Sequence, residues 1–286
     1  MFSFTLFHVT WTVDPILFTL GPFQIRWYSL LLASGFFFAY LTLQKVFKVE
    51  NLSAKLLDKL SIWTIVWTII GLRLGHFLFY EPEYFIEAPL QVFLPFDKSW
   101  NFIGYQGLAS HGAVISLILF LTYFAWKHKM NALWLLDRLC IVIPVAAGLV
   151  RIGNLMNHEI VGKITDVPWA FNFTRGGFTS SGEFIFGTLR HPTQLYEAIV
   201  YLLLFLFMVI YYFKITRENV PPGRIIGILL FVIFTARFFI EFYRGDTYRG
   251  IFFGLSTSQW ISLVLLSLAA IYFLRQSSKA TASTAH

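Results

Sequence analysis

Charged residues are scarce in this chain of 286 residues, because Asp, Glu, Lys and Arg together make up only 13% of it. Soluble domains carry about 25% charged residues, so the composition argues against a soluble fold. Hydrophobic residues make up 57% and aromatic residues 19%. An excess of Phe and Trp is typical of a lipid-facing surface with aromatic belts. The composition therefore predicts an all-α polytopic membrane protein.

Cysteine is nearly absent, since Cys140 is the single one in the sequence. This excludes an intramolecular disulfide and a cysteine-based metal cage. We expect Cys140 to pack in the interior and not to act as a nucleophile. The histidines show no metal-ligand spacing, so we expect neither a metal nor another cofactor. The first 24 residues lack a basic n-region and contain Asp14 and Pro15, which argues against a cleavable signal peptide.

Long apolar runs are what the chain does have. Seven of them approach the length of about 20 residues that crosses a membrane core. We predict transmembrane helices at Trp27–Val46, Leu57–Tyr80, Leu108–Trp126, Leu133–Val150, Gln194–Phe213, Ile225–Phe242 and Ser258–Leu274. Residues 1–275 are expected to form a single transmembrane domain. The polar, small-residue stretch 276–286 is expected to be a disordered tail.

The distribution of charge predicts the orientation of these spans. If the N-terminus lies outside, the inner segments contain twelve basic and four acidic residues, and the outer segments seven and nine. The positive-inside rule then gives an outer N-terminus and an inner C-terminus. The net charge of +7 is explained by a cytoplasmic rim beside anionic lipid, so no nucleic acid is expected as a partner. The long outer connection 153–191 is expected to form a small extracytoplasmic cap.

Polar side chains gather near the outer ends of several spans. An ionisable group at membrane depth costs about 2.5–3.5 kcal/mol even on a mild insertion scale, and such groups usually mark functional sites. Arg151 and Asn154 share one helix face if the helix continues. Arg151 has no carboxylate four residues away, so its partner lies in another segment or is a ligand. Arg237, Glu241 and Arg244 also share a face, and mutual neutralisation of Arg237 and Glu241 is the structural alternative to function.

Histidines and further polar residues extend this set. His111 stands at the expected outer start of the third span, where an interfacial helix cap explains it as well as catalysis does. Tyr28 opens the first span, and His191, Gln194 and Glu197 open the fifth. Guanidinium groups bind phosphate in a two-point manner, and a histidine beside them can accept a proton near neutral pH. The set indicates nucleophilic attack on a phospholipid, with phosphate as the leaving group.

Six motifs in order resemble the bacterial prolipoprotein diacylglyceryl transferase family, from about Asp14 to Gln259. They are Asp14-Pro-Ile-Leu-Phe with Gly21-Pro22 and Arg26-Trp27-Tyr28, Gly71-Leu-Arg73-Leu-Gly75 with Phe79-Tyr80, Ser110-His111-Gly112, Arg151-Ile-Gly-Asn154 through Gly162, His191-Pro-Thr-Gln-Leu-Tyr-Glu197, and Arg237-Phe-Phe-Ile-Glu241-Phe-Tyr-Arg244. Together they are highly specific. The family transfers the diacylglyceryl group of phosphatidylglycerol to a cysteine thiol of a prolipoprotein.

The resemblance implies roles for individual residues. The general base falls on His111, and the phosphatidylglycerol-binding arginine falls on Arg151. A second essential arginine, for catalysis and lipid binding, falls on Arg237. The remaining carried-over site residues are Tyr28, Glu159 and Glu241 as catalytic support, and Asn154 and Gly162 in lipid binding. Three departures from the family pattern adjoin the site, namely Ala113, Ile233 and Ser258-Gln259, and they bear on its fine geometry.

The resemblance therefore predicts an enzyme of the bacterial cytoplasmic membrane with its active site on the extracytoplasmic side. Its expected partners are phosphatidylglycerol and prolipoproteins with a lipobox cysteine, and we expect a monomer. A phospholipid flippase or small-anion transporter is the alternative, because arginines at membrane depth also mark ion pathways. Against a transporter stand the outer position of the polar cluster and the absence of an internal sequence repeat.

Overall fold

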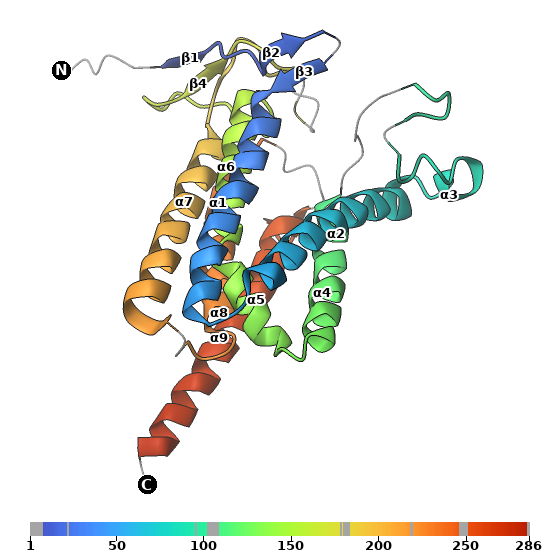
Figure 1. The fold of residues 1–286 in the computed structure, drawn as a ribbon. Helices are drawn as coiled ribbons and strands as arrows, with labels where there is room; N and C mark the ends of the chain where they lie inside the picture. The colour runs from blue at the N-terminus through green and yellow to red at the C-terminus, as the bar shows by residue number, and fades with distance from the viewer. Residues whose placement is uncertain are drawn as a thin grey trace, which may run out of the picture. The chain divides into compact units, whose positions relative to one another are not determined.

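The computed structural model describes residues 8–21, 23–94, 96–101, 109–177, 179, 184–217, 220–245 and 251–284 (Figure 1). The chain divides into two compact units. The large unit contains residues 1–43 and 137–286, and the small unit contains residues 44–136. They subdivide the stretch 1–275 that the sequence predicts as one transmembrane domain.

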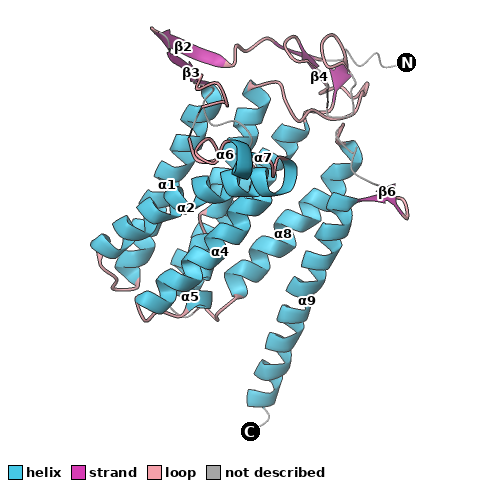
Figure 2. Ribbon diagram, turned by 90° about the vertical axis from the view of Figure 1, so that its right-hand side faces the viewer, coloured by secondary structure: helices cyan, strands magenta, loops and turns pink. Residues whose placement is uncertain are grey.

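Each of the seven predicted spans coincides with helical structure (Figure 2). The helices that correspond to them are α1 (Trp27–Val49), α2 (Ala54–Tyr80), α4 (Ser110–Lys127), α5 (Ala132–Cys140) with α6 (Ile143–Met156), α7 (Thr193–Ile210), α8 (Arg224–Ile240) and α9 (Thr257–Thr284). A short π-helix, η1 (Tyr211–Thr216), prolongs α7, and a 3-10 turn, η3 (Glu241–Tyr243), prolongs α8.

Five of the described helices are long and apolar enough to cross a membrane, namely α1, α2, α7, α8 and α9. Helices α5 and α6 are bent by 43° and make a sixth span if they count as one. Pro144 lies in the first turn of α6, where its missing N–H costs no hydrogen bond, and this explains the break. Helix α4 is apolar but shorter. These helices are those of a multi-pass membrane protein.

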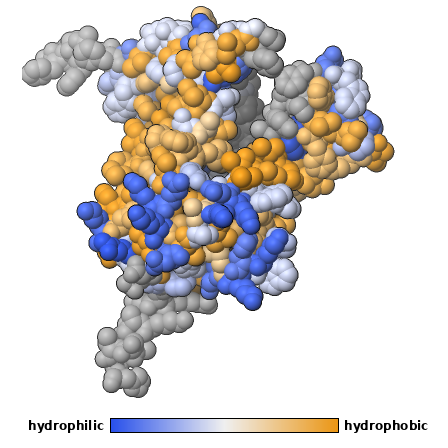
Figure 3. Space-filling view, in the orientation of Figure 1, coloured by the Kyte–Doolittle hydropathy of each residue, from blue (hydrophilic) through white to orange (hydrophobic). Residues whose placement is uncertain are grey.

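Large apolar side chains cover much of the helical surface, and orange areas of Figure 3 show them on one face. Phe37 and Phe38 on α1, Ile62 on α2 and Leu203 on α7 are all exposed to the surroundings of the protein. Burial of apolar surface drives folding in water, so an apolar exterior fits lipid and not water as the solvent. The same observation supports membrane embedding.

Small residues let the helices of the large unit approach closely. A Cβ atom on Gly35 of α1 would lie 2.9 Å from the Cα atom of Ala146 on α6. A Cβ atom on Gly148 of α6 would lie 2.9 Å from the side chain of Leu202 on α7. Close backbone approach of this kind replaces the hydrophobic driving force that lipid removes. It brings the ends of α1, α6 and α7 together, and the candidate site is built there.

Asp137 and Arg138 are charged residues inside the predicted span Leu133–Val150, and both count among the inner charges above. Both lie in α5 and are buried, with 0% and 1% of their surface exposed. The Asp137 carboxylate accepts hydrogen bonds from the backbone N–H groups of Gly223 and Ile226 at the start of α8. It thus caps the N-terminus of α8 from another helix. The Arg138 guanidinium lies over the Tyr212 ring. The two charges cancel, so the inner charge excess on which the orientation rests is unaffected.

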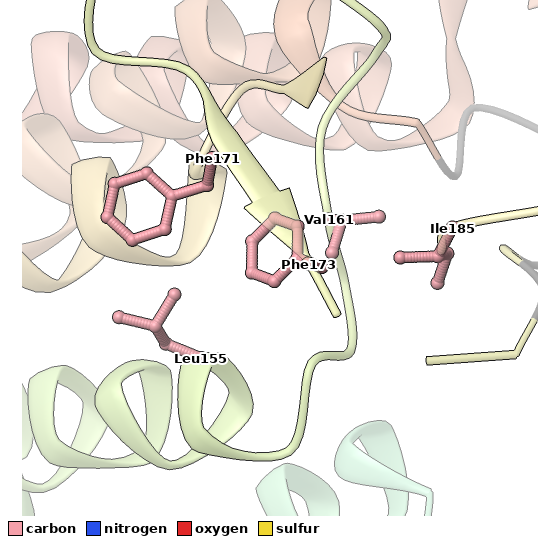
Figure 4. Close-up of a cluster of buried hydrophobic side chains, with 5 residues drawn as sticks. All are labelled: Leu155, Val161, Phe171, Phe173 and Ile185. Atoms are coloured by element: carbon pink, nitrogen blue, oxygen red, sulfur yellow. The ribbon is translucent and has the colours of Figure 1, made fainter. Parts of the chain in front are cut away.

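A small sheet joins the N-terminus to the segment that follows α6. Strand β1 (Val9–Trp11) pairs in parallel with β4 (Phe171–Phe173), which pairs antiparallel with β5 (Leu189–Arg190). Beneath it, five apolar side chains form a core, drawn in Figure 4: Leu155, Val161, Phe171, Phe173 and Ile185. The sequence predicts a cap from the 153–191 segment alone, and the structure pairs β1 with a strand of that segment. We call the sheet and this core the sheet region.

Three further elements complete the large unit. Strands β2 (Ile16–Leu20) and β3 (Phe23–Arg26) form a hairpin that leads directly into α1. Strands β6 (Ile251–Phe252) and β7 (Leu255–Ser256) form a second hairpin before α9. Helix α9 continues to Thr284, so the structure has helix over most of the predicted disordered tail. Ser, Lys and Ala tolerate helix well enough to prolong one that is already nucleated.

In the small unit, two glycines of α2 allow α4 to pack against it. A Cβ atom on Gly75 would lie 2.6 Å from the Cα atom of Gly112, so side chains at these positions would force the helices apart. Gly71 and Gly75 therefore serve the packing of the two helices. Arg73, also on α2, is buried and donates to the backbone carbonyls of Gln91, Val92 and Leu94. It thereby fastens the segment after α3 (Tyr84–Glu87) to the helix.

Candidate active site

Charged and polar side chains of the large unit meet where helix ends lie together. Arg151 lies near the C-terminal end of α6, and Glu197 lies near the N-terminal end of α7. Arg237 lies in the last turn of α8, followed at once by Glu241 and Arg244 around η3. Antiparallel helices alternate their N- and C-terminal ends at one level, so residues far apart in the sequence reach the same place.

Glu197 is the centre of this group. Its Oε2 pairs with Nε of Arg151, and its Oε1 pairs with a terminal nitrogen of Arg237. A terminal nitrogen of Arg244 lies 3.5 Å from the same Oε1. The Glu197 side chain is only 2% exposed, whereas the three arginine side chains are 13–21% exposed. The carboxylate therefore lies beneath three guanidinium groups that retain an accessible face. We call these four residues the arginine cluster.

Glu241 is a second carboxylate beside the arginine cluster, held more loosely. Its Oε2 lies 3.6 Å from Arg237 and 3.5 Å from Arg244, which are ion-pair distances longer than a hydrogen bond. Its Oε1 accepts a hydrogen bond of 3.1 Å from the hydroxyl of Ser256. Gln259 on α9 accepts the Ser256 backbone N–H and donates to the Phe238 carbonyl. The start of α9 thus positions Glu241.

A chain of amide contacts connects Arg151 to Glu159. Arg151 donates to Oδ1 of Asn154 at 3.1 Å, as the predicted shared helix face requires. Asn154 donates through Nδ2 to Oε1 of Glu159 at 2.8 Å, and Asn157 donates to the same oxygen at 3.1 Å. Tyr28 packs on this face, because a Cβ atom on Gly153 would lie 2.7 Å from the Tyr28 ring. The structure therefore brings together four residues that the sequence singled out: Tyr28, Arg151, Asn154 and Glu159.

The turn that carries Glu159 has an unusual backbone. His158 and Ile160 both adopt positive φ angles, 55° and 58°, and for a β-branched residue such as Ile160 this is strained. Three hydrogen bonds oppose the strain. Gln194 donates to the Glu159 carbonyl, Thr193 donates to the Ile160 carbonyl, and the His158 ring contacts the Val13 carbonyl at 2.8 Å. The polar residues that open α7 thus hold Glu159 in place.

Gly162 has a structural part in this site. A Cβ atom there would lie 2.6 Å from atoms of His191 and 2.7 Å from the Tyr243 carbonyl oxygen, so only glycine fits. Its backbone donates to the His191 carbonyl, accepts from buried Arg190 and forms a β-bridge to Arg244. The residue assigned to lipid binding by resemblance therefore sets the backbone position of Arg244.

Two histidines near the site lie outside the predicted spans. Burial lowers the pKa of His158, an effect that Arg175 strengthens and that Asp14 and the bond to Val13 oppose. Burial also lowers the pKa of His191, whose Nδ1 lies 3.1 Å from the Tyr196 hydroxyl. Both rings are favoured in their neutral forms. Neutral rings leave the positive charge of this part of the molecule to the arginines.

His111 belongs to the small unit. It lies in the first turn of α4 and is exposed. Its ring meets the Phe79 ring edge-on at 4.9 Å between centroids and the Tyr80 ring at 6.0 Å, both from the end of α2. The close packing of α2 on α4 at Gly75 produces these contacts. Of the departures from the family pattern, Ala113 lies two residues further along the same helix, and it is buried.

The arrangement can bind an anion and stabilise growing negative charge on it. Three guanidinium groups with an accessible face suit a phosphate, and Arg binds phosphate through paired, planar contacts. Within the residues that the structure describes, no three His, Cys, Asp or Glu side chains are grouped as metal ligands would be.

Known proteins with the same sequence pattern identify the family. The family described as prolipoprotein diacylglyceryl transferase matches residues 15–275. The chain belongs to the prolipoprotein diacylglyceryl transferase family. A relative from Bacteroides fragilis, named phosphatidylglycerol–prolipoprotein diacylglyceryl transferase, is 38% identical over 276 residues, which are 94% of this chain and 95% of the relative. Relatives of the same name from Chloroherpeton thalassium and Tolumonas auensis are each 36% identical, covering 93% and 94% of this chain and 94% and 97% of theirs.

Three polar residues were missed as members of this diacylglyceryl transferase site when the sequence was considered alone. The sequence alone places Glu197 at the start of the fifth span without indicating its role, and it indicates no role for Ser256 or Gln259. The available signal was charge balance. Glu197 and Glu241 are the only glutamates within the predicted spans, and both lie near the span ends that carry Arg151 and Arg237, which need partners at membrane depth. The main partner of Arg237 is Glu197, and Glu241 on its own helix is the weaker one.

Proposed function

We propose that this protein transfers the diacylglyceryl group of phosphatidylglycerol to the cysteine thiol of a prolipoprotein, the first step of lipoprotein maturation. The names of the relatives give the two substrates. The observation that carries the proposal is the convergence of Arg151, Arg237 and Arg244 around Glu197. Such a cluster suits the phosphodiester of a phospholipid headgroup, which carries one negative charge.

The reaction is a substitution at the carbon of the diacylglyceryl group that is bonded to the phosphate oxygen. His111 takes the proton of the cysteine thiol, since a thiolate and not a thiol is the effective nucleophile. The sulfur attacks the carbon, an S–C bond forms, and the C–O bond to phosphate breaks. The electron pair stays on the phosphate oxygen. The products are a thioether-linked diacylglyceryl cysteine and glycerol phosphate.

Arg151 and Arg237 assist the step because they stabilise the negative charge that grows on the phosphate. The phosphate gains negative charge as the C–O bond breaks, and guanidinium groups that tighten on it lower the barrier as well as the binding energy. Asn154 orients Arg151, and Glu159 holds Asn154. Tyr28 packs beside them, and Glu241 positions Arg237 and Arg244. Gly162 supports lipid binding through the position of Arg244.

We further propose the placement of this activity in the cell. The protein crosses the bacterial cytoplasmic membrane seven times, with α4 and the bent pair α5 and α6 each counted as one span. Its N-terminus lies outside and its C-terminus inside, as the positive-inside bias favours. The sheet region forms an extracytoplasmic cap, and the active site faces the extracytoplasmic side. The protein acts as a monomer without a cofactor.

A reconstituted assay tests the function and separates it from lipid transport. Purified protein is mixed with phosphatidylglycerol and a lipobox peptide, and the peptide is weighed by mass spectrometry. We expect a mass increase of one diacylglyceryl group and release of glycerol phosphate only when the peptide is present. A peptide with Ser in place of Cys should give no product, because its hydroxyl is far less acidic. Movement of labelled lipid between leaflets without peptide, and no thioether, would instead identify a flippase.

A further inference from the structure

The arginine cluster places a buried carboxylate behind the groups that would meet the lipid phosphate. Glu197 is 2% exposed, and both of its oxygens face guanidinium groups. An anion that approaches the accessible side of Arg151, Arg237 and Arg244 therefore experiences their attraction reduced by the charge of Glu197. Together with Glu241, two carboxylates lie among the three guanidinium groups and offset part of their positive charge.

The charge of the cluster affects the binding energies of substrate and product differently. In the proposed function, on which this inference rests, the substrate is a phosphodiester with one negative charge. The released glycerol phosphate is a phosphomonoester with a charge of about −1.5 to −2 at neutral pH. The electrostatic energy of an anion equals its charge multiplied by the local potential. Any increase of the positive potential therefore strengthens product binding nearly twice as much as substrate binding.

We propose that Glu197 is a positioning and specificity-determining residue that limits retention of the phosphomonoester product. It holds the three arginines together for the phosphodiester and at the same time lowers the potential that they create. Without its charge, the cluster would bind a dianion so tightly that glycerol phosphate would inhibit the enzyme. Glu241 contributes less, because its ion pairs are longer.

Two soluble headgroup fragments provide matched probes. Glycerophosphoglycerol is a diester with one negative charge, and glycerol phosphate is the monoester. The inhibition constants of both are measured in the transfer assay at fixed ionic strength above pH 7, and their ratio is compared between variants. A unit charge ~10 Å away at an effective dielectric constant of about 20 changes binding about tenfold per unit of ligand charge. The ratio cancels effects that act equally on both probes, such as a general loss of site geometry.

Charge-changing variants should move this ratio in both directions. Glu197→Gln should favour the monoester by about a further tenfold over wild type, and Glu197→Asp, which keeps the charge, should leave the ratio within about twofold. Arg244→Gln should shift the ratio about tenfold the other way. The double variant Glu197→Gln with Arg244→Gln should return it close to the wild-type value, because the formal charge is restored.

A ratio that Glu197→Gln leaves unchanged in a folded protein would overturn the inference. If Glu197→Gln does not fold, Arg244→Gln and the double variant decide. A double variant whose ratio equals that of Arg244→Gln also refutes a role for the Glu197 charge. Failure of the proposed function is a separate outcome: the wild-type protein would then release no glycerol phosphate in the presence of peptide.

Discussion

At the scale of single residues, Gly162 shows how a residue without a side chain can control one with a charge. Its backbone forms the β-bridge to Arg244 and accepts a hydrogen bond from Arg190. The space that a side chain would need is filled by His191 and by the Tyr243 carbonyl. The effect of this glycine on activity therefore operates through the position of Arg244.

We expect Gly162→Ala to destabilise the protein by about 1–3 kcal/mol, the usual cost of overpacking, and to reduce transfer by more than the loss of folded protein explains. Gly177→Ala is the matched control, because a Cβ atom at Gly177 would meet nothing within 4 Å. Thermal unfolding in detergent and glycerol phosphate release per folded molecule measure the two effects. Equal behaviour of the two variants would show that the close approach at Gly162 is unimportant.

His111 provides a second test at this scale. His111→Gln keeps the size and polarity of the side chain but removes the titratable ring, so activity should fall by about 10²- to 10⁴-fold with little change in unfolding temperature. His76→Gln in the same unit is the control, since the His76 ring pairs with Glu81 in the structure and has no proposed catalytic part. Near wild-type turnover of His111→Gln would reduce His111 to a helix-terminal residue.

At the scale of elements, the helices were predictable and the strands were not. Runs of about 20 apolar residues predict α1, α2, α7, α8 and α9 directly, since a membrane leaves a buried backbone few alternatives to helix. Strands β1, β4 and β5 have two or three residues each, and β1 pairs with β4 across more than 150 positions of sequence. Neither alternation nor turn chemistry is readable in segments so short.

The candidate site was likewise predictable only where its contacts lie within one helix. Spacing along one helix predicts the contact between Arg151 and Asn154, because residues three apart share a face. It cannot predict that Glu197 on α7 pairs with arginines from α6 and α8, because that depends on how the helices pack. For the same reason the sequence overestimates the Arg237–Glu241 pair, which is close along the chain but longer in space.

The sheet region should respond to acid through His158. The pKa of buried His158 is lowered in the folded state, so the unfolded state binds protons more readily between the folded and unfolded pKa values. Stability is therefore highest above a pH of about 6.5, the unfolded value, and declines as the pH falls through it. Asp14 acts in a lower window: its backbone bond to Ile16 and its pair with Arg175 lower its pKa, and this contribution is lost only below a pH of about 4.

Hydrogen exchange of residues 158–175 measures the response of the sheet region. After correction for the intrinsic rate, protection should be lower at pH 5.5 than at pH 7.5. In His158→Gln, which retains a donor for the Val13 carbonyl but cannot titrate, this difference should shrink. Identical pH dependence in wild type and variant would assign the acid response to other groups.

At the scale of the whole molecule, the proposed topology is open to direct test. A reporter fused after His286 should be active only if it works in the cytoplasm, and one fused before Met1 only if it works outside, because positive charge is concentrated on the inner segments. Exchange of the two reporters is the control. Periplasmic activity of the C-terminal fusion would require an even number of spans and would contradict the seven-span arrangement.

The pairing of Arg151 with Glu197 also constrains how the protein is made. During synthesis, α6 leaves the ribosome before α7, so Arg151 enters the translocon ahead of its carboxylate. An unpaired arginine is costly in lipid, and Arg237 arrives later still. If α6 inserts as part of a span, we expect it to stay at the translocon until α7 is inserted beside it. Insertion and assembly of these helices would then be coupled, and we expect α6 and α7 to leave the translocon as a pair.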